Sequence, residues 1–98
     1  MKNYISDLKV KIIPLTSSTG KLIPNQFELY TAKGSYFQSY QAVIAYKPNA
    51  PIAKIILDEN KWNFSSTTTK YLCRFLDMTK AQILKQIKEE KIVLRNLN

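Results

Sequence analysis

Residues 62–76 read WNFSSTTTKYLCRFL, and the hydrophobic pattern of the chain changes at this stretch. Before it, apolar side chains alternate as they do in strands, whereas within it they recur at intervals of three and four residues. Ser65 or Ser66 is suited to cap a helix, because a serine oxygen accepts hydrogen bonds from the first free amides. The stretch therefore predicts a helix, and its apolar face comprises Tyr71, Leu72, Phe75 and Leu76.

A second helix is expected directly after the first. Thr79 and Gln82 have the spacing of a capping box, in which each side chain bonds to the other residue's backbone amide. Ile83 and Ile87 continue the helical period behind it. Residues 91–97, KIVLRNL, then predict a last strand or a docked tail.

The part of the chain before residue 62 has the alternation of β-strands. Residues 7–15 alternate apolar and basic side chains, and residues 26–31 alternate again. Residues 35–46 form the longest β-favouring run, which we interpret as one strand, either central or carrying a bulge. Residues 53–57 predict a short apolar strand.

Strands followed by helices predict an α+β fold. We expect one antiparallel sheet of about four to five strands, with two helices packed at one face or end of it. Turn-forming residues separate the strands at 16–25, 33–34 and 47–51. A length of 98 residues suits one domain, so residues 1–98 are expected to fold as a single unit.

The composition excludes several kinds of catalytic site. The chain contains no histidine and one cysteine, so the usual general base, the usual triad partner and a cysteine or histidine zinc site are all missing. Asp58 and Glu59 are adjacent at a turn and splay apart, and Cys73 is expected to be a small, buried or half-buried apolar residue. We therefore expect no enzyme, no metal site and no small-molecule cofactor.

The remaining features suit a soluble protein of basic character. No stretch approaches the ~20 apolar residues that cross a membrane, and the first residues lack the apolar core of a secretory signal, so a cytoplasmic location without membrane contact is expected. Lys and Arg together number 15 against 7 Asp and Glu, a net charge of +8. Such an excess favours negatively charged partners.

Tyrosines and lysines interleave along the predicted strands, as they do in proteins that bind single-stranded nucleic acid. Tyr36 and Tyr40 are candidates for stacking on bases, and Lys54 for a phosphate contact. Trp62 either seals the first helix onto the sheet or stays exposed as a further stacking platform. Lys9 and Lys11 either contact phosphates or protect a sheet edge from pairing with other chains.

Hydroxyl side chains gather at the start of the first predicted helix, in residues 65–69. Ser65 and Thr67, with Lys70 and Arg74 further along, have the composition of a phosphate site at a helix N-terminus. The same hydroxyls are also sufficient to cap the helix without any ligand. Both interpretations stay open on the sequence.

Four motifs are spread along the chain: F-x-S-Y at 37–40, I-A at 44–45, L-D at 57–58 and W-x-x-S-x-T-T-x-K-Y-x-x-x-F-L at 62–76. In these motifs the chain resembles a family of short, uncharacterised proteins from phages and other mobile elements, and the resemblance covers most of its length. It implies an accessory protein of a mobile element and does not imply an enzyme. The sequence departs from the usual pattern at Asn63, Thr69, Leu72 and Cys73.

Two functions follow as hypotheses. The first is a non-catalytic protein that binds RNA, DNA or a host ribonucleoprotein, with an inhibitor of an RNA-guided CRISPR nuclease as its most specific form. The second is a module that binds an acidic host protein, such as a replication or transcription subunit. Salt dependence separates them, because each phosphate contact releases counterions.

Overall fold

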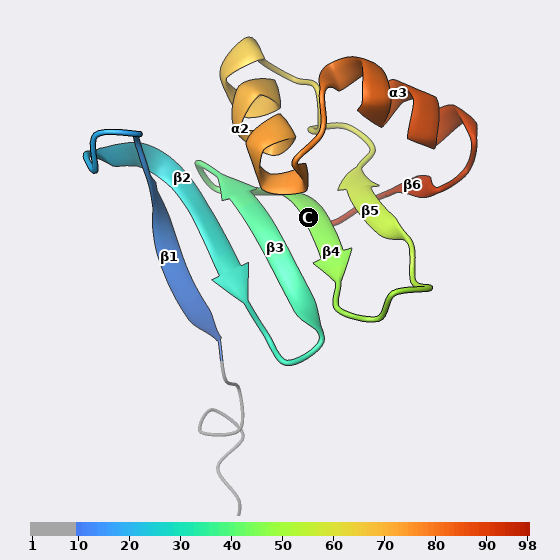
Figure 1. The fold of residues 1–98 in the computed structure, drawn as a ribbon, viewed down its shortest axis with the longest axis horizontal. Helices are drawn as coiled ribbons and strands as arrows, with labels where there is room; N and C mark the ends of the chain where they lie inside the picture. The colour runs from blue at the N-terminus through green and yellow to red at the C-terminus, as the bar shows by residue number, and fades with distance from the viewer. Residues whose placement is uncertain (1–9) are drawn as a thin grey trace, which may run out of the picture.

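The structure is a computed structural model that describes residues 10–98. Within these residues the six strands form one sheet, and their order in the sheet is their order in the sequence (Figure 1). Neither described helix is long and apolar enough to cross a membrane. The elements are β1 (Lys11–Thr16), β2 (Leu22–Tyr30), β3 (Gly34–Ser39), β4 (Ala42–Pro48), β5 (Ile55–Asp58), α2 (Ser66–Leu76), α3 (Lys80–Lys88) and β6 (Ile92–Arg95).

The predicted α+β class is confirmed, but the sheet differs from the expectation in two respects. It has six strands instead of four to five, and its last pair, β5 and β6, is parallel instead of antiparallel. The parallel pair follows from the connection, because α2 and α3 lie between β5 and β6 and carry the chain back to the end from which β5 started.

The extra strand comes from the run 35–46, which folds as the hairpin β3–β4. Its turn is Tyr40 and Gln41, since Ser39 pairs with Ala42. The register then shifts between Phe37 and Gln38, which leaves Ile44 without a partner in β3. Neither Tyr40 nor Gln41 is a residue type typical of a tight turn, so the sequence did not indicate the break.

The second strand is also longer than expected, because residues 22–25 belong to β2 and not to a loop. Asn25 has a left-handed φ of 65°, a conformation that asparagine tolerates. Its carbonyl accepts a hydrogen bond of 2.6 Å from the amide of Tyr40. The bond holds β2 against the β3–β4 turn.

Both helices begin at the residues that the sequence indicated. The Ser65 hydroxyl caps α2 by accepting a hydrogen bond of 3.1 Å from the Thr68 amide. Thr79 and Gln82 form the complete capping box of α3, with bonds of 2.8 and 3.1 Å. Local side-chain chemistry therefore sets both starting points.

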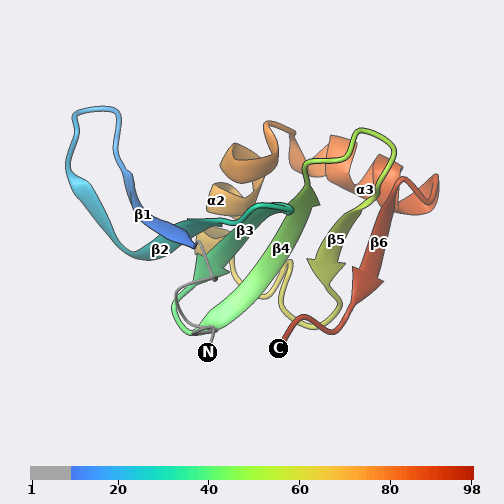
Figure 2. The ribbon, with the colours of Figure 1, turned by 90° about the horizontal axis from the view of Figure 1, so that it is seen from below.

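The two helices pack on the same face of the sheet, and no helix of residues 10–98 covers the other face (Figure 2). Phe37 of β3 stacks on Phe75 of α2 with ring centroids 5.8 Å apart. Leu57, Leu72 and Ile83 are completely buried in the same cluster. One hydrophobic core thus lies between the helices and one side of the sheet.

A buried carboxylate ties the end of β5 to the residues after β6. Asp58 is 1% exposed, and its oxygens accept hydrogen bonds from the amides of Asn60 and Leu97 and from the side chain of Asn98, at 3.1, 2.8 and 3.0 Å. Asn98 in turn bonds to both the amide and the carbonyl of Val43. The Asn98 carboxamide therefore provides Val43 with the bonds that a neighbouring strand would otherwise supply.

Candidate nucleic-acid interface

The face of the sheet opposite the helices presents a continuous row of side chains. Because neighbouring residues of a strand point to opposite faces, and because Phe37 and its partner Ala45 point toward the helices, Tyr36 and Tyr46 point away from them. Each strand contributes one residue to the row, and these residues are paired in register across the sheet. This open-face row comprises Ile12, Leu29, Tyr36, Tyr46, Ile56 and Val93.

Two tyrosines form the centre of the open-face row. The rings of Tyr36 and Tyr46 lie 4.6 Å apart between centroids with an interplanar angle of 39°. The Tyr46 hydroxyl donates a hydrogen bond of 3.1 Å to the carbonyl of Lys33. Packing and this bond fix the tyrosine pair before any ligand arrives, so little side-chain entropy is lost when a partner stacks on it.

A hollow of about 740 Å³ adjoins the tyrosine pair on this face. Tyr46, Ile56 and Val93 line it together with residues from the loops at 32–33 and 48–54. Its cationic lining residues are Lys33, Lys54 and Arg95, and none of the described residues that line it is a carboxylate.

None of these three cations forms an ion pair with a carboxylate of residues 10–98. One ion pair is found in that part of the chain, between Lys91 and Glu89 at 3.5 Å. Asp58 is the partner of Arg95 in the β5–β6 register, but its oxygens are occupied by the hydrogen bonds described above. Lys33, Lys54 and Arg95 are therefore available to an external anion.

A glycine makes room for the Tyr46 ring. A Cβ atom at Gly34 would lie 2.6 Å from the Lys47 carbonyl oxygen and 2.7 Å from the ring of Tyr46. Since the backbone oxygen has little freedom to retreat, no side chain fits at this position without movement. The missing side chain thus sets how closely β3 and β4 approach beside the hollow.

We expect Gly34→Ala to lower the stability of the fold by about 2 kcal/mol, because overpacking forces the strands and the Tyr46 ring apart. Thermal unfolding measures the loss, and the ring-proton NMR signals of Tyr36 and Tyr46 report the displacement. Ala32→Ser, at an exposed position nearby, is the control and should change neither. Unchanged unfolding and unchanged tyrosine signals in Gly34→Ala would show that the close approach has no structural consequence.

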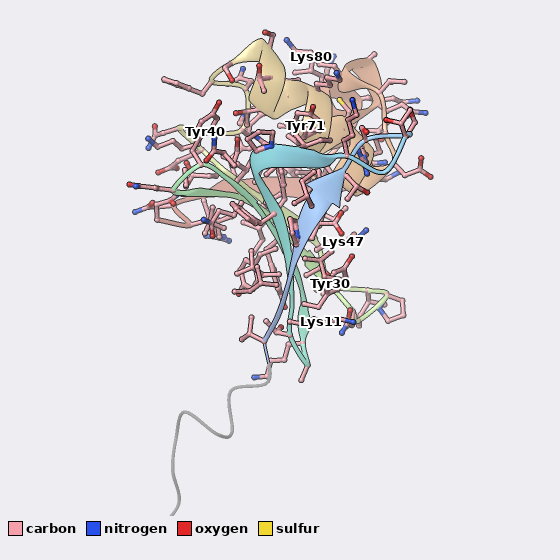
Figure 3. The ribbon with its side chains drawn as sticks, turned by 90° about the vertical axis from the view of Figure 1, so that its left-hand side faces the viewer. Lys11, Tyr30, Tyr40, Lys47, Tyr71 and Lys80 are labelled. Carbon is pink, nitrogen blue, oxygen red and sulfur yellow. The ribbon has the colours of Figure 1, made fainter. Side chains whose placement is uncertain are left out.

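The structure places two of the candidate residues on the open face. Tyr36 belongs to the open-face row and Lys54 lines the adjoining hollow. Lys11 instead pairs with Tyr30 and lies on the helix-bearing side, where Figure 3 shows it with Tyr30 and Lys47. Lys9 lies outside the described residues.

Two candidates have structural roles instead. Trp62 is 6% exposed and belongs to the core, so it is not a stacking platform. The reason is that the turn after β5 places the Trp62 side chain in the core cluster that the sheet and the helices share. Ser65 uses its hydroxyl as the helix cap, and the hydroxyls of Thr68 and Thr69 bond to Ser39 and to the Ser65 carbonyl. Of the two interpretations of these hydroxyls, capping is the one that these bonds support.

The remaining candidates occupy two further hollows. Tyr40 is 57% exposed at the β3–β4 turn, with a left-handed φ of 57°, and lines a groove of about 680 Å³ together with Thr67. Two further exposed residues of this groove, Lys61 and Phe64, were not predicted as site residues, and their ammonium and ring centroid lie 5.8 Å apart. Lys70 and Arg74 lie on α2, beside the β1–β2 turn.

Arg95 was also missed, because its place depends on the parallel pairing of β5 and β6. The only signal in the sequence was its position in the last predicted strand, directly after three apolar residues. Residues 10–98 contain no group of three or more acidic, cysteine or histidine side chains that would hold a metal ion.

Comparison with known proteins identifies a family for this chain but assigns it no function. The curated proteins contain no match to this chain, and neither do the solved structures. Residues 10–92 match a protein family described as a family of unknown function, DUF8033. This span includes five of the six positions of the open-face row, and Val93 lies just beyond it. Since the match covers most of the chain, the protein belongs to the DUF8033 family.

Proposed function

We propose that this protein binds single-stranded nucleic acid, without catalysis, on the open face of its sheet. The observation that carries the proposal is the position of the Tyr36–Tyr46 pair beside a hollow lined by Lys33, Lys54 and Arg95, with no described carboxylate in the lining. Aromatic rings stack on any base, while ammonium and guanidinium groups bind the phosphates between bases.

The shape of the face favours a single strand over a duplex. Six strands at a spacing of about 4.8 Å give the open-face row a length of roughly 24 Å, enough for several nucleotides in an extended strand. The bases of a duplex are stacked inside it and are not free to lie on a flat aromatic surface. Single-stranded RNA and DNA both have the required chemistry.

The biological setting belongs to the same proposal. The resemblance to proteins of phages and mobile elements suggests an accessory protein in the cytoplasm of a host cell. A guide RNA held by a host ribonucleoprotein offers exposed bases and phosphates, so an RNA-guided CRISPR nuclease is the most specific partner that we propose. The proposed effect is inhibition by occupation of that surface.

The double substitution Tyr36→Leu and Tyr46→Leu tests the stacking part of the proposal, since it keeps apolar side chains in the row. We expect affinity for a fluorescent single-stranded oligonucleotide to fall about ten-fold, because stacking on an aromatic ring contributes ~1–3 kcal/mol per base. Fluorescence anisotropy at ~50–200 mM salt measures it.

Tyr30→Leu is the matched control, because Tyr30 belongs to the same sheet but lies on the side that carries the helices. Its affinity should equal that of the wild type. Equal losses in both variants would contradict stacking on the open face. Absence of oligonucleotide binding at every salt concentration would contradict the proposal as a whole and favour a protein partner.

A further inference from the structure

A separate basic hollow lies between α2 and the turn that joins β1 to β2. Its volume is about 320 Å³. Figure 3 shows Tyr71 on α2 beside the β1–β2 hairpin. The hollow is on the helix-bearing side of the sheet and shares no lining residue with the hollow of the open face. The lining residues are Ser17, Ser18, Ile23, Lys70, Tyr71 and Arg74.

Two segments far apart in the sequence bring these groups together. Lys70 and Arg74 are four residues apart on α2, so their side chains leave the same face of the helix. The β1–β2 turn is closed by hydrogen bonds from the Ser17 amide to the Lys21 carbonyl and from the Gly20 amide to the Ser17 carbonyl, at 2.7 and 2.9 Å. This ordered turn holds the two serines opposite the helix.

The charges in the hollow are unbalanced. Lys70 and Arg74 form no ion pair with a carboxylate of residues 10–98, and no described acidic residue lines the hollow. Like charges at this helical spacing repel each other. The Lys70 ammonium has a weak partner in the Tyr71 ring, 5.3 Å from its centroid. An anion between the two cations would remove the repulsion.

We propose that this hollow binds a phosphate group, either free or in the backbone of a nucleic acid. A guanidinium offers a planar pair of donors that matches two phosphate oxygens, and an ammonium adds a mobile charge. Serine hydroxyls are common additional donors to phosphate. The inference does not depend on the open face, because the two surfaces have no residue in common.

The direct test is an NMR titration of the full chain with inorganic phosphate, in which backbone and Arg side-chain resonances are followed. We expect the largest shifts at Ser17, Ser18, Lys70 and Arg74. In the double variant Lys70→Glu and Arg74→Glu, the apparent affinity should fall at least about ten-fold, as expected for the loss of two charge-assisted contacts.

The double variant Lys85→Glu and Lys88→Glu is the matched control, since it makes the same change in net charge at exposed positions of α3. It should retain the shifts at the hollow. Equal weakening in both double variants, or phosphate shifts spread over all lysines, would overturn the proposal, because either result means a general charge effect.

A second measurement separates the two sources of phosphate. If a single-stranded oligonucleotide displaces inorganic phosphate from the hollow, the natural ligand is a backbone phosphate. If the oligonucleotide leaves the phosphate shifts unchanged, whether or not it binds elsewhere, the natural ligand is a free phosphate. Displacement and lack of displacement both support the site. The double variant Tyr36→Leu and Tyr46→Leu should keep the phosphate shifts. The phosphate site can therefore be confirmed or rejected whether or not the open-face proposal holds.

Discussion

Reversal of the three cations at the open face, by Lys33→Glu, Lys54→Glu and Arg95→Glu together, is expected to weaken binding of a single-stranded oligonucleotide about 100-fold at 0.1 M salt. The estimate rests on counterion release, because each phosphate contact on a single strand makes the affinity fall with about the 0.7 power of salt concentration. For the same reason, the plot of log affinity against log salt should become less steep, with the magnitude of its slope reduced by about 2. Anisotropy titrations at four or five salt concentrations provide both numbers.

The control for this variant is Lys80→Glu, Lys85→Glu and Lys88→Glu. These three lysines are exposed on α3, on the other side of the sheet, and the change in net charge is the same. It should lose far less affinity and keep a slope close to that of the wild type. If both triple variants lost affinity equally, net charge alone would explain binding, and the open face would not be the interface.

Substitution of the buried carboxylate, Asp58→Ala, is expected to have the largest effect on stability. It leaves the amides of Asn60 and Leu97 and the side chain of Asn98 without their acceptor in a buried site. Loss of charge-assisted bonds of this kind costs about 3 kcal/mol. In a domain of this size that equals a fall of roughly 15 °C in Tm, which thermal unfolding measures.

The same carboxylate makes stability depend on pH. Burial raises the pKa of Asp58, but the hydrogen bonds from Leu97, Asn98, Asn60 and Lys61 together lower it below its ordinary value of 3.8. A lowered pKa in the folded state stabilises the fold above the ordinary pKa, and this contribution disappears as the pH falls through the lowered value. The difference in stability between wild type and Asp58→Ala should therefore shrink below about pH 4.

Glu59→Ala provides the control for both measurements, because Glu59 is the adjacent acid and is exposed. It should unfold within about 0.5 kcal/mol of the wild type and with the same dependence on pH. A stable Asp58→Ala variant would show that water replaces the carboxylate at no cost. A constant difference between wild type and Asp58→Ala from pH 7 to pH 2 would contradict the lowered pKa.

Predictions from local sequence agree with the structure where local chemistry decides the outcome. The Ser65 cap and the Thr79 capping box start their helices as expected, because the bonds involve residues within four positions of each other. The run 35–46 was misjudged because Tyr40 and Gln41 lack the residue types of a tight turn, and Tyr40 adopts a conformation unusual for a bulky side chain.

The candidate binding residues named from the sequence do not share one surface. Tyr36 and Lys54 share the open face, but Tyr40, Lys11 and the pair Lys70 and Arg74 lie on other surfaces. Trp62 illustrates the reason. A tryptophan in a turn can be buried or exposed, and only the packing of the core cluster buries this one.

By itself the sequence determined the basic charge, the α+β class, the two helices with their starting residues, and the absence of histidine-based chemistry, since these depend on composition and on contacts between near neighbours in the chain. Only the tertiary structure decided which side chains share a surface. The placement of both helices on one side leaves the tyrosine pair uncovered by the described helices. Strand register brings Arg95 into the hollow that adjoins this pair. Such juxtapositions arise from pairing between residues tens of positions apart, which no local pattern specifies.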